Sequence, residues 1–456
     1  MKIKAMAAVA ACKFFRGLMH IAGRGGTTLP GRVAGALDKN ILKEVSEGMD
    51  IIVVTGTNGK TTTSAIISRA VAAGGGKCVT NSSGANLLPG VISTLACNRD
   101  FRGRPKADHA VIECDEGALK HVVPLISPKV IVVTNLFRDQ LDRYGEVTNT
   151  LESIRTGIKS CGDSIVCLNA DCSLTASLAD DAPGRTRFYG IDVPWGSQED
   201  RDISDAKYCI HCGAEYSYSY HTYAHLGGFR CPSCGYSRPD ADVHVTAIGK
   251  ADAEGSVVDL MIDGRTYRAQ IALPAIYNIY NACAAACACD AAGVPAEDVL
   301  AAEEGQEAAF GRMESFDLGS AGTVMILVKN PTGCDLALDH VTGIGKDHDL
   351  VLCLNDETAD GHDISWIWDV GFEKLRDDPF MKRVTVSGKR AEDMQLRLKY
   401  AGVPEDSISM EKDMAVLVKV IEGCTRPVYI LPNYTCMLAL RSEIEKATGG
   451  REYWQE

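Results

Sequence analysis

The chain has 456 residues, of which 46% are apolar and 23% charged, and its formal net charge is −13. A length of this order suggests about three domains, the composition is that of an ordinary globular protein, and the acidic balance argues against a nucleic-acid partner. Eighteen cysteines, most of them in apolar segments, fit a reducing cytoplasm better than a disulfide framework.

The N-terminal segment, residues 1–48, begins MKIKAMAAVAACKFFRGLMH. Its first apolar run is short, rich in alanine and followed at once by Lys13 and Arg16, which disfavours the alternative of an export signal. We predict an amphipathic helix that packs on the body or touches a membrane surface. No run reaches the roughly 18 apolar residues of a membrane span.

Residues 51–63 read IIVVTGTNGKTTT and predict a buried strand that turns through glycines into a helix. Such a turn directs backbone N–H groups and the helix dipole at a phosphate, Lys60 adds a positive charge, and the Thr61 hydroxyl can ligate Mg²⁺. The spacing Gly-x-x-Gly-Lys-Thr is shorter than the general P-loop pattern. The alternative is a glycine-rich turn that binds nothing. The candidate loop residues are Gly56, Thr57, Asn58, Gly59, Lys60, Thr61 and Thr62.

Three further segments, residues 108–116, 128–136 and 163–171, read as buried strands with polar ends. In a doubly wound parallel sheet these ends gather on one edge, so Glu113, Asn135 and Asn169 should lie near the phosphate loop. Glu113 is a candidate Mg²⁺ ligand or orienter of a catalytic water. The alternative is a solvated strand-end acid.

The remaining pattern predicts two α/β domains. Residues 256–274 read as a hairpin joined by Asp263-Gly264, and 274–293 as an alanine-rich helix. Residues 190–205 read as a loop into an insertion. The composition changes near 311–320, and a second strand and helix series follows. We therefore predict a central P-loop parallel-sheet domain over 49–315 and a C-terminal Rossmann-like α/β domain over 316–456.

The insertion, about residues 205–238, carries two Cys-x2-Cys pairs separated by eighteen residues, and a glycine follows each pair. This spacing is typical of a zinc ribbon in which four thiolates hold a structural Zn²⁺. The predicted ligands are Cys209, Cys212, Cys231 and Cys234. His211, His221 and His225 lie nearby and are expected not to be ligands.

An ordered set of motifs resembles the Mur ligases, which form acyl-phosphates on peptidoglycan precursors with ATP. It comprises TGTNGKTTT, Glu113, TNLFRDQLDRYG at 134–145, the pair Asn278 and Asn281, and GRME at 311–314. With the ribbon and the C-terminal segments VKNPTG, NDETADGHDISWIWD and LPNYTCML, the chain resembles the MurT family. Its members are the synthetase subunits of lipid II isoglutaminyl synthase, and their glutaminase partner is GatD.

The resemblance implies roles for individual residues. Gly56 to Thr62 would hold the ATP phosphates, with Lys60 on the β- and γ-phosphates and Thr61 and Glu113 on Mg²⁺. Asn278 and Asn281 would line the nucleotide pocket, and Arg312 would reach the phosphates. Residues 329–331 would lie where the C-terminal domain closes over the site.

Two positions depart from the Mur ligase pattern, because Gln140 and Tyr277 stand where many members have histidines. The modified lysine of several amino-acid-adding members cannot be located. The resemblance also implies that an aspartate of residues 355–363 completes a Cys-His-Asp triad in the partner. We favour Asp356, and Asp360 and Asp363 remain alternatives.

The expected function is ATP-dependent amidation of the D-glutamate α-carboxylate in the lipid II stem peptide, with ammonia from a GatD-like subunit. The enzyme would be cytoplasmic and would work at the inner membrane face. One alternative is a stand-alone amino-acid-adding ligase of Mur or folylpolyglutamate type. Another is a non-catalytic binding module that uses the ribbon.

Overall fold

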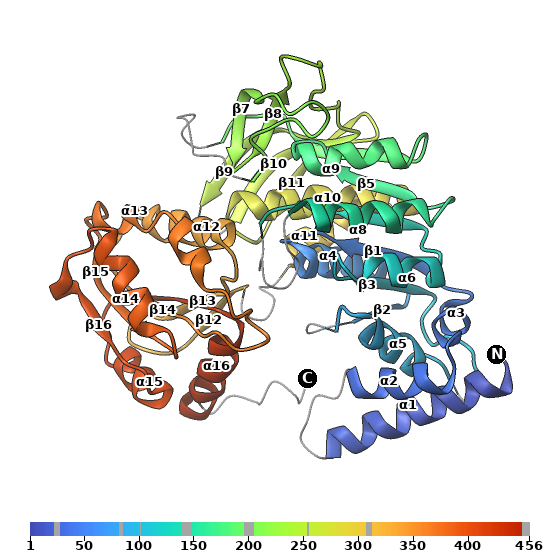
Figure 1. Cartoon of the computed structure of the whole chain (residues 1–456), viewed down its shortest axis with the longest axis horizontal. Helices are drawn as coiled ribbons and strands as arrows, with labels where there is room; N and C mark the ends of the chain where they lie inside the picture. Colours follow the sequence, from blue (N-terminus) through green and yellow to red (C-terminus); the bar gives the residue numbers. More distant parts are fainter. Residues whose placement is uncertain are drawn as a thin grey trace. The chain divides into compact units, whose positions relative to one another are not determined.

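The computed structural model describes residues 1–21, 28–81, 85–100, 102–138, 147–195, 205–252, 255–306 and 312–448 (Figure 1). The chain divides into two compact units. The first comprises Met1–Phe137 and Val147–Glu307, and the second comprises Arg138–Glu146 and Ala308–Glu456.

The first unit is built on a nine-stranded sheet in the order β11-β10-β9-β6-β5-β4-β1-β3-β2. Its strands from β6 to β2 are parallel, β9 joins β6 in parallel, and β10 and β11 run antiparallel at the edge. The strands are β1 Asp50–Thr55, β2 Cys78–Thr80, β3 His109–Glu113, β4 Val130–Val133, β5 Ile165–Asn169, β6 Thr186–Ile191, β9 Val243–Asp252, β10 Gly255–Ile262 and β11 Arg265–Ile271.

The central position of β1 in this sheet explains its apolar sequence. β1 lies between β3 and β4, and its apolar residues 51–54 are buried on both faces, as the run of β-branched side chains predicts. At the antiparallel edge, Asp263 and Gly264 have φ of 48° and 73° between β10 and β11. Two consecutive positive φ values are those of a tight hairpin turn, and the predicted hairpin is confirmed.

Helices cover both faces of the sheet. α10 is buried over nearly its whole length, because its alanines and cysteines are small enough to pack against the strands. Gly293, with φ of 82°, ends it. The helices of this unit are α1 Ile3–Ile21, α2 Thr28–Leu37, α3 Ile41–Ser46, α4 Lys60–Ala73, α5 Leu88–Cys97, α6 Leu119–Ile126, α8 Val147–Lys159, α9 Ser173–Ala176, η1 Ser177–Asp181, α10 Ile276–Ala292 and α11 Ala296–Glu304.

The insertion between β6 and β9 forms a separate two-stranded sheet of β7 Ser217–Tyr223 and β8 Leu226–Arg230. The predicted loop at 190–205 is wrong at its start, because Gly190 and Ile191 belong to β6 and pair with β9. Hydrogen-bonding to the neighbouring strand outweighs the weak strand propensity of glycine there. Residues 196–204 lie outside the described part.

The second unit has a six-stranded sheet in the order β12-β13-β17-β14-β15-β16, parallel except for β12. Leu338 and Leu398 lie in one apolar core, and Leu417 and Leu440 lie in another. The first core includes side chains of α12 and α14, and the second includes side chains of α15 and α16. Helices therefore cover both faces of the sheet, as predicted for a Rossmann-like domain. The strands are β12 Arg312–Phe316, β13 Thr323–Ile326, β14 His348–Cys353, β15 Met381–Ser387, β16 Ile408–Met410 and β17 Val428–Pro432. The helices are α12 Pro331–Thr342, η2 Ser365–Asp369, α13 Glu373–Arg376, α14 Ala391–Tyr400, η3 Glu405–Ser407, α15 Met414–Glu422 and α16 Tyr434–Thr448.

Among the helices that the structure describes, none combines the length and hydropathy that a membrane-spanning segment needs.

One acid lies in the apolar core of the first unit. Glu303, on α11, is fully buried, and neither of its carboxyl oxygens has a hydrogen-bond partner among the residues that the structure describes. Burial raises its pKa to about 8, because the charged form loses its hydration without a compensating charge.

We expect the stability of the chain to fall as pH rises toward 8. The folded form keeps the Glu303 proton at a pH where the unfolded form has lost it. The stabilisation is therefore complete below the unfolded value of 4.5 and is lost as pH passes through the folded pKa of about 8. The slope can reach about 1.4 kcal/mol per pH unit. Denaturant unfolding of Glu303→Gln should lack this component.

The neighbouring Glu304, which is exposed, supplies the control. Glu304→Gln should retain the pH dependence of the parent chain. Equal slopes for the parent and both variants would show that Glu303 does not titrate in this range.

Candidate functional site

The phosphate loop connects β1 to α4 at residues 56–59. Gly56 and Gly59 have φ of 119° and 86°, which favour glycine. A side chain would also find no room: a Cβ at Gly56 would collide with Thr134, and one at Gly59 with the side-chain oxygen of Asn281. The glycines are therefore required both by the turn and by the close approach of neighbouring segments.

The residues after β4 fix this loop from one side. The Asn58 backbone N–H donates to Asn135 Oδ1 at 2.9 Å, and the Thr134 hydroxyl donates to the Asn58 carbonyl at 2.7 Å. The Thr57 N–H donates to the Asn135 carbonyl at 2.9 Å. The expectation that Asn135 lies beside the loop is confirmed. Asn169 lies one step further away, donating to the Thr134 carbonyl at 3.1 Å.

Lys60, the first residue of α4, is buried and paired. Its Nζ lies 2.9 Å from Glu116 Oε1 and donates to the carbonyls of Gly56 and Thr57. Burial alone would lower its pKa, but the negative charges of Glu116 and Glu113 outweigh burial and raise it. Lys60 is therefore kept protonated where the loop meets α4.

Glu116 is the residue that sequence reasoning missed. It is 5% exposed, and burial raises its pKa while Lys60 opposes that shift. It lies three residues beyond Glu113 in the polar end after β3. The only signal available was the density of acids in the segment ECDE, which does not indicate which acid meets the lysine.

Thr61, in the first turn of α4, and Glu113, at the end of β3, form an oxygen pair. The Thr61 hydroxyl donates to Glu113 Oε2 at 2.8 Å. The Asn81 side chain bonds both backbone groups of Glu113, receiving its N–H at 2.8 Å and donating to its carbonyl at 2.7 Å. Hydroxyl and carboxylate oxygens are ligands that Mg²⁺ accepts, so these residues fit that ion.

Asn278 and Asn281 lie near the start of α10 and are buried at 4% and 3% exposure. Asn281 Nδ2 donates to Asn278 Oδ1 at 3.1 Å, and Asn278 donates to the Pro274 carbonyl at 2.6 Å. The Asn281 oxygen faces Gly59. The structure thus brings Asn281 of this predicted pair against the loop, with Asn278 hydrogen-bonded beside it.

Other predicted positions are not placed at this site. Arg312 begins β12 in the second unit, and its side chain is outside the described part. Gln140 and the end of the TNLFRDQLDRYG segment also fall outside the described residues. Asn330 caps α12, accepting from the Gly333 N–H at 2.8 Å.

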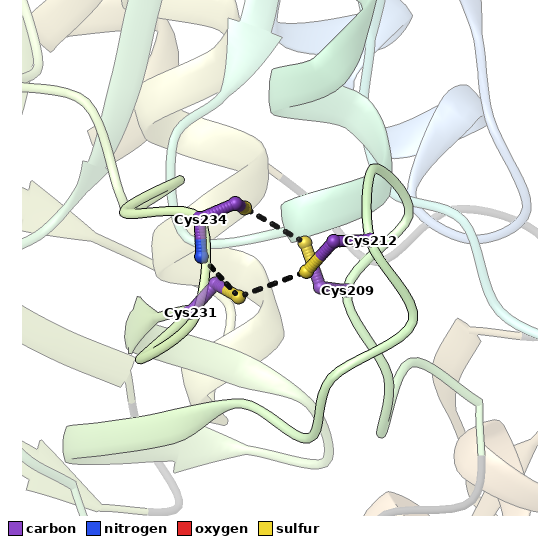
Figure 2. Close-up of side chains that lie close together, drawn as sticks. All are labelled: Cys209, Cys212, Cys231 and Cys234. Atoms are coloured by element: carbon purple, nitrogen blue, oxygen red, sulfur yellow. Dashed lines mark hydrogen bonds between the residues drawn. The ribbon is translucent and has the colours of Figure 1, made fainter.

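The four predicted ribbon cysteines meet at one point. Figure 2 shows the two pairs facing each other, and all four Sγ atoms lie within 4.8 Å of one another. The distances are 3.6 Å from Cys209 to Cys234 and 3.4 Å from Cys212 to Cys231. A backbone hydrogen bond from Cys234 lowers the pKa of Cys231 to about 6. Such a cluster could form a zinc site.

The turns around the cysteines match each other. Gly213 and Gly235 have φ of 77° and 80°, and their N–H groups donate to the carbonyls of Cys209 and Cys231. Each turn lets the two sulfurs of a pair point the same way, as the sequence predicts.

The nearby histidines have other contacts. The His211 ring lies edge-on to Tyr236 with centroids 4.4 Å apart, and His221 stacks on Tyr218 at 4.2 Å. His225 Nε2 lies 3.3 Å from Cys172 Sγ in a fully buried pair. None of the three belongs to the four-sulfur cluster.

In the second unit, the three candidate aspartates follow β14 and differ in their contacts. Asp360 is 6% exposed and accepts from both the N–H and the hydroxyl of Thr435. Asp363 accepts the Ser365 N–H at 2.8 Å. The Asp356 side chain is 33% exposed, with a long ion pair of 3.8 Å to Arg390. Of the three aspartates, Asp356 therefore has the weakest side-chain contacts within the chain.

Comparison with known proteins finds relatives that match most of the chain. The Mur ligase middle domain profile matches residues 54–208, and the MurT ligase C-terminal profile matches 327–437. The chain is 34% identical to the lipid II isoglutaminyl synthase (glutamine-hydrolyzing) subunit MurT of Streptococcus pneumoniae, over 91% of this chain and 92% of that protein. It is 32% identical to the subunit of the same name from Staphylococcus aureus, over 97% and 98%.

Among solved structures, the fold is similar to a pseudomurein peptide ligase type C from Methanothermus fervidus. The TM-score is 0.67 at 19% sequence identity, covering 90% of this chain and 81% of that one. The predicted Mur ligase fold is confirmed.

Proposed function

Because this chain belongs to the MurT family, we propose that it amidates the D-glutamate α-carboxylate of the lipid II stem peptide, giving D-isoglutamine. The names of its relatives supply the product and the acceptor. The observation that carries the proposal is the glycine-rich loop after β1, beside which Lys60, Thr61 and Glu113 come together. This is the arrangement that an ATP-dependent ligase needs at a parallel sheet edge.

In the proposed reaction, an oxygen of the D-glutamate α-carboxylate attacks the γ-phosphorus of ATP and ADP leaves. Ammonia then attacks the carbonyl carbon of the acyl-phosphate, loses a proton and expels inorganic phosphate. The loop N–H groups and Lys60 would neutralise the phosphoryl charge as it moves. Arg312 would add a further positive charge, and Asn278 and Asn281 would line the nucleotide pocket.

Thr61 and Glu113 would hold Mg²⁺, which supplies charge neutralisation between the phosphates when bound. Glu116 keeps Lys60 protonated, so the lysine is a cation before any nucleotide arrives. On binding, Lys60 Nζ would exchange the carbonyls of Gly56 and Thr57 for phosphate oxygens while it retains Glu116.

The ammonia would come from a GatD-like glutaminase subunit, in line with the subunit and glutamine-hydrolysing names of the relatives. Asp356 would complete the triad of that partner, orienting its histidine and stabilising the imidazolium. The contacts of Asp360 with Thr435 and of Asp363 with Ser365 support this choice. Lipid II is membrane-bound, so the enzyme would work at the inner face of the plasma membrane.

The ribbon would hold a structural Zn²⁺ through Cys209, Cys212, Cys231 and Cys234. Four thiolate ligands leave no open position for chemistry. The metal would stabilise the insertion, whose apolar cluster is small: Ala176, Cys209, Tyr216, Phe229 and Cys231 are its buried members.

Removing Lys60 should abolish amidation. Lys60→Ala would leave Glu116 buried without its partner, so the sharper variant is Lys60→Ala combined with Glu116→Gln. We expect ADP release with acceptor and ammonium to fall by at least about 10²-fold, because charge neutralisation at the phosphoryl group is lost. Lys77→Ala, at an exposed lysine of the same unit, is the control. Full activity of the double variant would remove the loop from the mechanism.

The proposed role of Asp356 in the partner's triad can be tested by comparing amidation from glutamine with amidation from ammonium. Asp356→Asn should lose glutamine-dependent amidation and keep ammonium-dependent amidation, because only the histidine of the glutaminase is affected. Asp363→Asn should keep both. Unchanged activity of Asp356→Asn with glutamine would refute the triad role.

Metal analysis tests the ribbon. We expect about one zinc ion per chain, lost in Cys212→Ser and retained in His211→Ala, with a lower melting temperature only for the cysteine variant. Cys212 is exposed, so its substitution removes a ligand without opening the core. A folded parent chain without zinc would contradict the assignment.

A nucleophile assay distinguishes the proposed amidation from the alternative of an amino-acid-adding ligase. The purified chain is incubated with ATP, a stem-peptide acceptor and either ammonium or single amino acids. Product with ammonium alone supports the proposal, whereas product with an amino acid alone supports the alternative.

A further inference from the structure

Exposed apolar side chains gather at the N-terminal end of the first unit. Fourteen large apolar residues stand exposed in the described part of the chain, and eight of them fall within residues 1–37. Those eight are Met1, Ile3, Met6, Phe14, Leu18, Ile21, Leu29 and Leu37. So large a concentration in a small part of the chain marks an interaction surface.

Most of them lie on one face of α1. Ile3, Phe14 and Ile21 are 88%, 67% and 87% exposed, and Met6 and Leu18 lie at intermediate helical spacing. Intervals of three, four and seven residues put these side chains on one stripe. We call Ile3, Met6, Phe14, Leu18 and Ile21 the α1 outer face.

The opposite face of α1 packs against the rest of the first unit. Ala5, Ala8, Val9 and Cys12 are buried. α1 packs against α2 and α5, and Figure 1 shows the three helices side by side. α2 is itself locked to α5, because a Cβ on Gly31 would collide with the Pro89 backbone. α1 is therefore a fixed element that presents its outer face and cannot turn to bury it.

The charge of α1 opposes that of the chain. The helix contains Lys4, Lys13, Arg16 and His20 and no acidic residue, whereas the whole chain carries a net charge of −13. At 100° per residue, Lys4 falls on one side of the outer face and Lys13 and His20 fall on the other. An apolar stripe bordered by cations is the pattern of a helix that lies in a membrane surface.

We propose that the α1 outer face docks onto an anionic phospholipid bilayer, with the helix axis in the membrane plane. The apolar side chains would enter the acyl boundary, and Lys4 at the border of the stripe would meet the headgroup phosphates. The charge complementarity selects a lipid surface over a second copy of this acidic chain. The inference rests on the proposed function only for its purpose, which is to hold the enzyme where a lipid-linked acceptor lies.

Vesicle co-sedimentation of the purified full-length chain tests the docking. The probes are vesicles of phosphatidylglycerol and phosphatidylcholine in equal parts, and vesicles of phosphatidylcholine alone. We expect binding to the first, weaker binding to the second, and a loss at about 1 M salt, where screening is nearly complete.

Phe14→Ser combined with Leu18→Ser should weaken binding to the anionic vesicles about tenfold or more, because apolar area is lost from the bilayer. Leu18 and Leu396 are 50% and 48% exposed, so Leu396→Ser is a matched control that should bind like the parent. Lys4→Glu should reduce binding to anionic vesicles and leave binding to neutral ones unchanged.

Three results would overturn the proposal. The first is no sedimentation of the parent with anionic vesicles, and the second is equal sedimentation of the parent and the Phe14/Leu18 variant. The third is a dimeric parent and a monomeric variant that both fail to bind vesicles, which would assign the outer face to a second copy of the chain.

The acceptor separates this inference from the catalytic proposal. With the glutaminase partner present, the Phe14/Leu18 variant should amidate a soluble muropeptide at the parent rate and lipid II in vesicles more slowly. If neither the parent nor the variant amidated either acceptor, the catalytic proposal would fail. Vesicle co-sedimentation would still test the membrane docking by itself.

Discussion

The site depends on keeping one buried cation at a helix N-terminus. Lys60 begins α4, where the helix dipole is unfavourable for a positive charge, and it is only 6% exposed. Glu113, Asp115 and Glu116 lie close enough to offset both costs and hold the ammonium group protonated. The oxygens of Thr61 and Glu113 beside this cation would suit a divalent metal ion, and the loop N–H groups would suit phosphate.

The same edge of the sheet connects the site to the insertion. Asp171, just beyond β5, is fully buried and lies 2.5 Å from both Arg238 Nε and the Tyr280 hydroxyl. Arg238 follows the ribbon, and Tyr280 lies on α10 between Asn278 and Asn281. The ribbon is thereby fastened to the helix that supports the loop. These contacts give the insertion a structural place in the first unit.

Contiguous features could be predicted from the sequence. The strand, glycines, lysine and hydroxyls of residues 51–63 form one local unit, and the paired cysteines determine their own turns through the glycines that follow. The fold class came from alternating strand and helix patterns and from the Mur ligase resemblance. The contacts that hold the site together were not predictable in this way. Asn281 meets Gly59, and Glu116 rather than Asp115 pairs with Lys60, because those choices depend on how separate strands end in space. The buried Glu303 and the commitment of Asp360 to Thr435 were missed for the same reason, since an acid in a helix or a turn reads as solvated.

We propose that phosphoryl transfer at the loop after β1 drives formation of the amide. The most direct measurement counts ADP and D-isoglutamine together, with the chain, its glutaminase partner, glutamine, ATP and lipid II present. We expect one ADP for each new amide, with both products lost when Lys60 is replaced. Amide formed without ADP, or ADP released without any amide, would contradict it.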